Sequence, residues 1–157
     1  MHAGSRTAKV PSMAAEEIRI GELSIRFLLE GGASGGSAAL FEFTVPASAR
    51  VPVAHSHDAY EETVYGLEGT LTWTVDGEQH EVGPGEALCI RRGAVHRFEN
   101  EGEVDARVLA IVTPGLLGPG YFREMAAVVD EAITAGTPPD PARIGEVMLR
   151  HGLTPAP

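Results

Sequence analysis

Apolar and polar residues alternate over short stretches of the chain, most of which end near a glycine or a proline. From Ile18 to Leu29 the alternation breaks once, at Gly21-Glu22, which predicts two strands joined by a turn. Asp76-Gly77 lies between the alternating stretches 70–75 and 78–82, an arrangement typical of a hairpin with a type I′ turn. Further strands are predicted at Ala39–Val45, Val51–His57, Ala87–Ile90, His96–Asn100 and Ala106–Thr113. Strands that recur this closely indicate a closed antiparallel barrel or a jelly roll.

After Pro114 the apolar spacing changes to that of helices. It predicts a helix at Tyr121–Ala135, with Ile133 in its apolar stripe. Asp140 followed by Pro141 is typical of the start of a second helix, and we expect both helices to pack on the outer face of the barrel. The chain is thus expected to comprise a disordered N-terminal extension at residues 1–12, a β-barrel at residues 13–116 and a helical extension packed on the barrel at residues 117–157.

The overall charge and the single cysteine narrow the class of protein. A formal net charge of −10 argues against binding to nucleic acid and to anionic lipids, since both need clustered lysine and arginine. No apolar run approaches the ~20 residues of a membrane span, so no membrane association is expected. Cys89 has no partner for an intrachain disulfide and lies in the apolar run 87–90, which predicts a buried thiol and a reducing, cytoplasmic location.

Candidate metal ligands occur at two places in the chain. His55 and His57 are two residues apart on a predicted strand, so both imidazoles point to the same side. Glu62 has the wrong parity to join them on a straight strand, and a turn at Asp58-Ala59 is therefore expected to deliver it from the adjoining strand. His96 completes a set of three imidazoles and one carboxylate, which suits one divalent ion of Fe, Mn, Ni, Co, Cu or Zn.

The same residues lie in two motifs that resemble those of the cupin superfamily. The first motif is His55-x-His57-x4-Glu62-x6-Gly69, and the second is Gly85-x5-Arg91-x-Gly93-x2-His96-x3-Asn100. Two turn positions differ from the usual pattern, where Ala49 replaces a glycine and Arg91 replaces a proline. Glu61 fits a shorter form of the first motif but is the less suitable ligand, because strand alternation faces it outward. The resemblance implies an all-β double-stranded β-helix, a jelly-roll barrel that holds the metal ion inside.

The chain also shows a narrower similarity to quercetinase-like cupins. It lies in the segment Tyr-Glu-Glu-Thr-Val-Tyr at residues 60–65 and in the tail from Tyr121 to Leu153. It implies a dioxygenase for a small aromatic or enol-bearing substrate, in which Glu62 is also the catalytic base. Two alternatives stay open: a non-redox isomerase, cyclase or lyase that uses the ion as a Lewis acid, and a barrel that binds a small molecule without chemistry. The resemblance also implies a homodimer.

Three aromatic residues complete the predictions. Trp73, Phe98 and Tyr65 are expected in the core. For Trp73 and Phe98 the alternative is a place beside the metal, which makes these two the candidate substrate-pocket residues.

Overall fold

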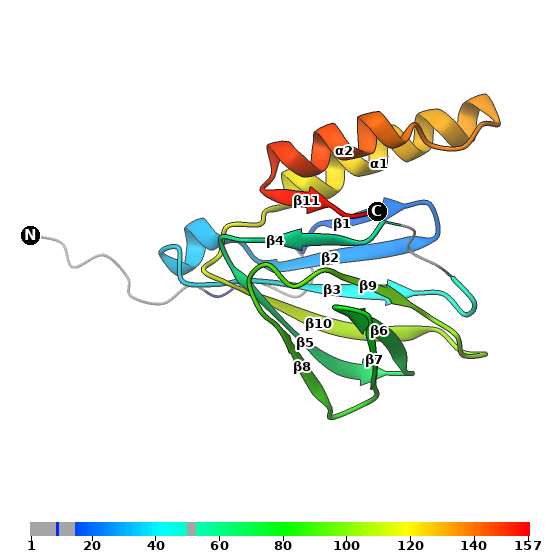
Figure 1. The fold of residues 1–157 in the computed structure, drawn as a ribbon. Helices are drawn as coiled ribbons and strands as arrows, with labels where there is room; N and C mark the ends of the chain where they lie inside the picture. Colours follow the sequence, from blue (N-terminus) through cyan, green and yellow to red (C-terminus); the bar gives the residue numbers. More distant parts are fainter. Residues whose placement is uncertain (1–8, 10–14, 50–52) are drawn as a thin grey trace, which may run out of the picture.

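The computed structural model describes residue 9 and residues 15–49 and 53–157 of the chain (Figure 1). In this part of the chain the strands form two antiparallel sheets. The six-stranded sheet has the order β1 (Glu17–Ile20), β2 (Leu23–Leu29), β3 (Ala39–Val45), β10 (Ala106–Thr113), β5 (Glu61–Glu68) and β8 (Ala87–Ile90). The five-stranded sheet has the order β11 (Leu153–Pro155), β4 (His55–His57), β9 (His96–Glu99), β6 (Leu71–Val75) and β7 (Glu78–Val82).

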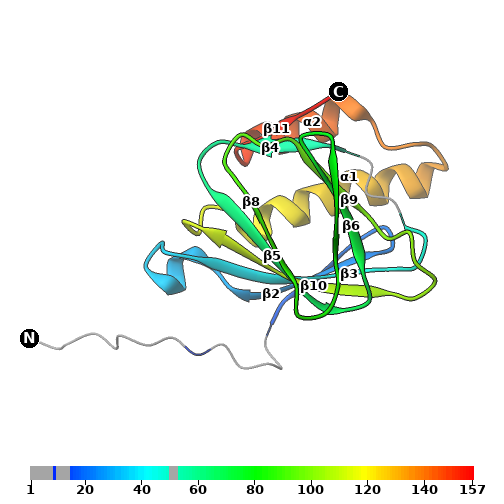
Figure 2. The same ribbon diagram turned by 60° about the horizontal axis from the view of Figure 1, so that its bottom comes forward.

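The two sheets pack against each other as a sandwich (Figure 2), and the core lies between them. Every second residue of β3 and of β10 is buried, as expected for strands with one face toward a core. The inward residues of β6 and β9 close the interior from the opposite side, with the rings of Trp73 and Phe98 centred 4.8 Å apart. This architecture confirms the predicted all-β jelly-roll fold with two C-terminal helices.

Several local predictions are confirmed by the strand register. β1 and β2 pair across the turn at Gly21-Glu22, and β6 pairs with β7 across Asp76-Gly77. Both residues of the second turn have positive φ, 48° at Asp76 and 86° at Gly77, as a type I′ turn requires. The glycine-rich stretch between β2 and β3 contains a short 3₁₀ helix, Gly31–Ser34.

The two helices are α1 (Pro119–Ala135) and α2 (Pro141–Arg150), and their position differs from the prediction. They lie side by side next to β1 and β11 (Figures 1 and 2). Phe122 of α1 packs against the inward rings of Phe41 and Phe43, at centroid distances of 5.1 and 6.4 Å. The helices therefore cover the opening between the sheets and complete the core. Ile133, near the end of α1, is 62% exposed and lies outside this contact.

Strand parity also corrects two predictions of burial. Cys89 is exposed, because its neighbour Ile90 takes the inward position on the edge strand β8. Tyr65 is 40% exposed for the same reason, since Val64 is the buried residue of that pair. Except for Lys9, the predicted disordered extension at residues 1–12 lies outside the described residues, and so do Val51 and Pro52. In the part that is described, no helix has the length and apolarity needed to span a membrane.

Candidate metal centre and cavity

Three of the four predicted ligands meet between the sheets. His57 ends β4 and His96 begins β9, both in the five-stranded sheet, whereas Glu62 lies on β5 in the six-stranded sheet. The chain crosses from one sheet to the other at residues 58–60, which connect β4 to β5. This crossing allows Glu62 to face the two imidazoles despite its odd spacing, as the sequence predicts. The site therefore depends on both sheets being packed together.

The ligand atoms of these three residues converge on one point. One oxygen of Glu62, Oε2, lies 3.3 Å from Nε2 of His57 and 3.5 Å from Nε2 of His96. The three potential ligand atoms lie within 4.8 Å of one another, and the residues are only 1–5% exposed. A buried carboxylate is costly unless a positive charge neutralises it. A cation is therefore needed at this point, either a proton shared with an imidazole or a metal ion.

The other imidazole nitrogens are held by the backbone. Nδ1 of His57 donates to the carbonyl oxygen of Tyr60 at 2.9 Å, and Nδ1 of His96 donates to that of Ala94 at 3.0 Å. Because a carbonyl oxygen only accepts, Nδ1 carries a proton in both rings, and in the neutral imidazoles, which are the forms that bind a metal ion, each Nε2 has a lone pair directed at the site. Backbone partners of this kind orient histidines that bind metals. The arrangement fits a transition metal ion, and the buried Nε2 of His96, which has no hydrogen-bond partner, is the atom that an ion would satisfy.

The charges at the site influence one another. Burial alone would raise the pKa of Glu62, but the proximity and charges of His57 and His96 lower it below its usual range. Burial alone would lower the pKa of His96, and the Glu62 carboxylate raises it above its usual value. Glu62 is thus ionised at neutral pH, as a carboxylate ligand must be.

His55 lies beside this group but not within it. Its ring centroid is 4.5 Å from that of His96 and 6.2 Å from that of His57, and its Nδ1 donates to the carbonyl oxygen of Val53 at 3.2 Å. Burial, followed by the charge of His96, lowers the pKa of His55 to about 4. The imidazole is therefore neutral at neutral pH, which metal binding requires. Its role as the fourth ligand stays a prediction.

The lowered pKa of His55 predicts that the metal-free protein loses stability as the pH falls from 6.5 to about 4. In this window a histidine of the unfolded chain takes up a proton and folded His55 does not, so acid favours the unfolded state by about 3 kcal/mol. Urea unfolding of chelator-treated protein across this range measures the effect. His55→Gln should reduce the loss by that amount, and His80→Gln on the β6–β7 hairpin is the matched control. Equal pH dependence in His55→Gln and the parent would contradict the prediction.

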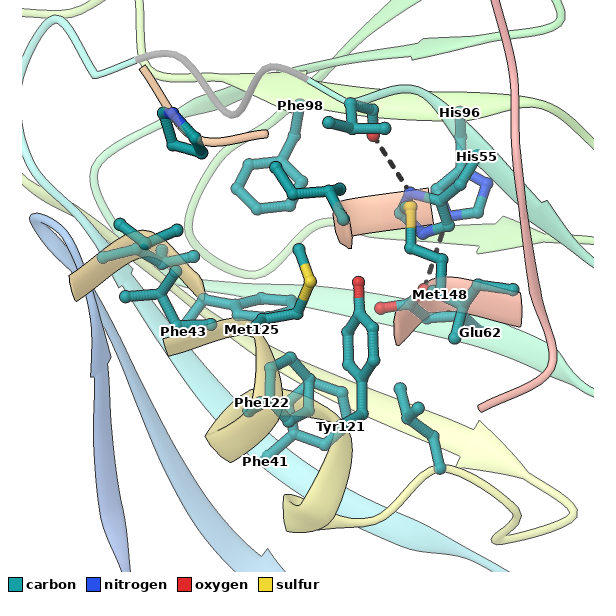
Figure 3. A pocket seen from close by; sticks show the side chains of 18 of the residues that line it. Phe41, Phe43, His55, Glu62, His96, Phe98, Tyr121, Phe122, Met125 and Met148 are labelled. Carbon is teal, nitrogen blue, oxygen red and sulfur yellow. Dashed lines mark hydrogen bonds and ion pairs between the residues drawn. The ribbon is translucent and has the colours of Figure 1, made fainter. Parts of the chain in front are cut away.

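A cavity of about 150 Å³ adjoins the metal centre. His55, His96 and Glu62 lie at one end of it, and a set of aromatic rings lies toward the other end (Figure 3). The apolar wall comes from both sheets and from both helices, and includes Phe41, Phe43, Phe98, Phe122, Met125 and Met148. Trp73 and Phe98, the two candidate substrate-pocket residues, both line this cavity and are both buried. They are therefore core residues whose side chains also face the cavity, and their contact with a substrate stays a prediction.

Two further residues at the polar end of the cavity were not singled out by the sequence. Tyr60 is 1% exposed and stacks on the ring of His57 at 4.1 Å, and Tyr121 of α1 is 7% exposed. Burial, and then the charge of Glu62, raises the pKa of both phenols above the usual range. Both therefore stay protonated. Tyr121 begins the helix that the sequence predicts, but its place in the cavity could not be predicted, because the position of that helix depends on tertiary packing.

The neighbouring carboxylate, Glu61, lies outside the site. It forms an ion pair with Arg92 at 2.9 Å, and its side chain is 36% exposed. The strand alternation that separates it from Glu62 is thus observed directly.

Comparison with known proteins agrees with this description. Residues 41–112, which include all the candidate ligands, match the sequence profile of the cupin domain. The fold and the site define a cupin-type protein with a cluster that can hold a metal ion. Residues 41–112 of the chain are therefore similar to the cupin domain.

Individual relatives differ in how much they share with the chain. It is 33% identical over 91 residues to the tetracenomycin polyketide synthase protein TcmJ of Streptomyces glaucescens, over 58% of this chain and 61% of that protein. It is 32% identical over 73 residues to quercetin 2,3-dioxygenase of Bacillus subtilis, over 46% of this chain and 21% of that enzyme. The structure of the polyketide cyclase RemF from Streptomyces resistomycificus matches with a TM-score of 0.57 at 25% identity, over 78% of this chain and 98% of RemF.

Proposed function

We propose that this protein is a metal-dependent enzyme that converts a small enol-bearing or phenolic substrate without a change of oxidation state, as a cyclase does. The observation that carries the proposal is the convergence of two imidazole Nε2 atoms and one carboxylate oxygen at the end of an aromatic-lined cavity. A divalent transition metal ion bound there would act as a Lewis acid on a substrate oxygen. His57, Glu62 and His96 would hold the ion, with His55 as the proposed fourth ligand.

The remaining residues contribute binding and proton transfer. The aromatic wall excludes water and holds an apolar ring, which orients the substrate oxygen toward the polar end. The Glu62 carboxylate can accept a proton from a substrate hydroxyl, since it is ionised and faces the cavity. The O–H bond then breaks, the proton binds to Glu62 and the negative charge stays on the substrate oxygen.

The extent of similarity favours a cyclase over a dioxygenase. The likeness to RemF extends over 78% of this chain and nearly all of RemF. The similarity to quercetin 2,3-dioxygenase is local, covering 21% of that enzyme. A dioxygenase remains the second candidate, because that local similarity exceeds 30% identity and both candidates use the same type of centre.

Oxygen dependence distinguishes the two candidates. The first probe is 1-(2-hydroxyphenyl)-1,3-butanedione, which cyclises to a chromone with loss of water and without redox change. The protein loaded with Zn²⁺ should accelerate this reaction in the absence of oxygen, and a chelator should abolish the acceleration. The second probe is quercetin, with oxygen uptake measured for the Fe, Mn, Ni, Co and Cu forms. Oxygen uptake with quercetin and no cyclisation would replace the cyclase with the dioxygenase, and inactivity toward both probes would count against both candidates.

A further inference from the structure

Unpaired buried polar atoms gather around the cavity. Among the described residues, four buried side-chain nitrogen or oxygen atoms have no hydrogen-bond partner, and three of them belong to residues that line this one cavity. These three are Oη of Tyr60, Nε1 of Trp73 and Nε2 of His96. A metal ion would pair with the histidine nitrogen. The hydroxyl group of Tyr60 and the indole N–H group of Trp73 then remain as donors without a partner. Leaving a buried donor unpaired costs about 1–3 kcal/mol, so a ligand that accepts hydrogen bonds is the natural partner.

The hydroxyl of Tyr121 lies at the same end of the cavity. Figure 3 shows it directed toward the Glu62 carboxylate from the opposite wall. Tyr60, Tyr121 and Glu62 all line this cavity, and the ring of Tyr60 stacks on that of His57 at 4.1 Å. One phenol comes from the β4–β5 crossing and the other from α1, so the two hydroxyl groups belong to different elements of the cavity wall.

We infer that the hydroxyl groups of Tyr60 and Tyr121 form a paired hydrogen-bond-donor site for a substrate oxygen beside Glu62. The inference deepens the proposed function and rests on it for the reaction. An oxygen that gives its proton to Glu62 becomes negatively charged, and two O–H donors stabilise that charge in a cavity whose lining is mainly apolar. The ligand class is a phenol or an enol, because such a group has an oxygen that accepts from both tyrosines and a proton that can pass to Glu62.

The size of the cavity indicates the probe. An engineered cavity of about 150 Å³ binds benzene, so one aromatic ring fits a space of this volume. Phenol and toluene have nearly the same shape and differ in the hydroxyl group that would contact the two tyrosines. Trp73 is the only tryptophan of the chain and lines the cavity, so its fluorescence reports binding of either probe.

The test compares tyrosine-to-phenylalanine variants of the full chain loaded with Zn²⁺. Phenol should bind the parent about tenfold more tightly than toluene, and Tyr60→Phe and Tyr121→Phe should each remove most of this difference without changing toluene affinity. Tyr65→Phe is the matched control, because Tyr65 is the remaining tyrosine and is 40% exposed. Calorimetry and Trp73 emission both measure the affinities.

Thermal unfolding provides a second measurement that distinguishes ligand binding from a structural role. Because Oη of Tyr60 has no protein partner, Tyr60→Phe should unfold at the same temperature as the parent or higher. A phenol-to-toluene ratio that is unchanged in both cavity variants would overturn the inference. So would an equal loss in Tyr65→Phe. These are binding measurements that need no turnover, so failure of the proposed reaction in the cyclisation assay would be a separate result.

Discussion

Replacing Glu62 with glutamine is expected to weaken binding of a divalent transition metal ion by about a thousandfold, and to abolish turnover. The change removes the charge while keeping the shape, and it leaves two lone-pair-bearing imidazoles without the carboxylate that lies 3.3 and 3.5 Å from them. Loss of one partner from a buried charged pair costs about 3–5 kcal/mol, which corresponds to this change in affinity. Titration with Zn²⁺ or Co²⁺, followed by calorimetry, measures it.

The adjacent carboxylate supplies the control for this experiment. Glu61→Gln alters a partly exposed ion pair with Arg92 and should leave metal affinity within about twofold of the parent. At metal concentrations that saturate the Glu62→Gln variant, any remaining loss of turnover reports its role as a base. Equal metal affinities in the two variants would show that Glu62 does not bind the metal ion. Full turnover of the saturated Glu62→Gln variant would show that Glu62 is a ligand but not a base.

A chain that ends at Gly152 is expected to lose metal binding and about 4 kcal/mol of stability. The deletion removes β11, which pairs with β4 through Leu153↔His57, Thr154↔Ser56 and Pro155↔His55. On its other side β4 has one register pair, His55↔His96, so β11 is the main support of the strand that carries two candidate ligands. Leu153 is 2% exposed, and loss of such a buried leucine alone costs about 2–5 kcal/mol.

A shorter deletion isolates the contribution of the strand pairing. A chain that ends at Pro155 keeps all three register pairs and loses the hydrogen bond from the Ala156 amide to the Ala54 carbonyl, 2.8 Å long. It should bind metal nearly as well as the full chain. Metal titration and urea unfolding of the three proteins give the comparison. Unchanged metal affinity in the chain that ends at Gly152 would show that β4 is held by other contacts.

Local sequence patterns accounted for most of the elements. The Asp76-Gly77 turn, the break at Gly21-Glu22 and the start of α2 at Asp140 depend on backbone preferences within a few residues. The structure has each of them where the sequence predicts it. The side chain of Asp140 accepts a hydrogen bond from the Ala142 amide at 2.9 Å, which is the cap that the prediction assumes.

The predictions that failed concern which of two faces is buried. Cys89 lies in an apolar run that reads as buried, yet on an edge strand only one parity faces the core and Ile90 occupies it. The helices show apolar stripes in the sequence, but these do not reveal whether the stripe meets the outer face of a sheet or the opening between two sheets. Phe122 contacts the inward rings of β3, which shows that the helices cover the opening between the two sheets.

The sequence by itself determined most of the strands and turns, the two helices and the chemical kind of the candidate ligands, since each depends on residue type and short-range spacing. It also separated Glu62 from Glu61, because strand parity is a local property. Only the tertiary structure decided that His57 and His96 meet Glu62 from the opposite sheet, that β11 supports β4, and that Tyr121 reaches the same cavity as Tyr60. These contacts join residues far apart in the chain, and they form only when the sheets and the C-terminal helices pack around one core.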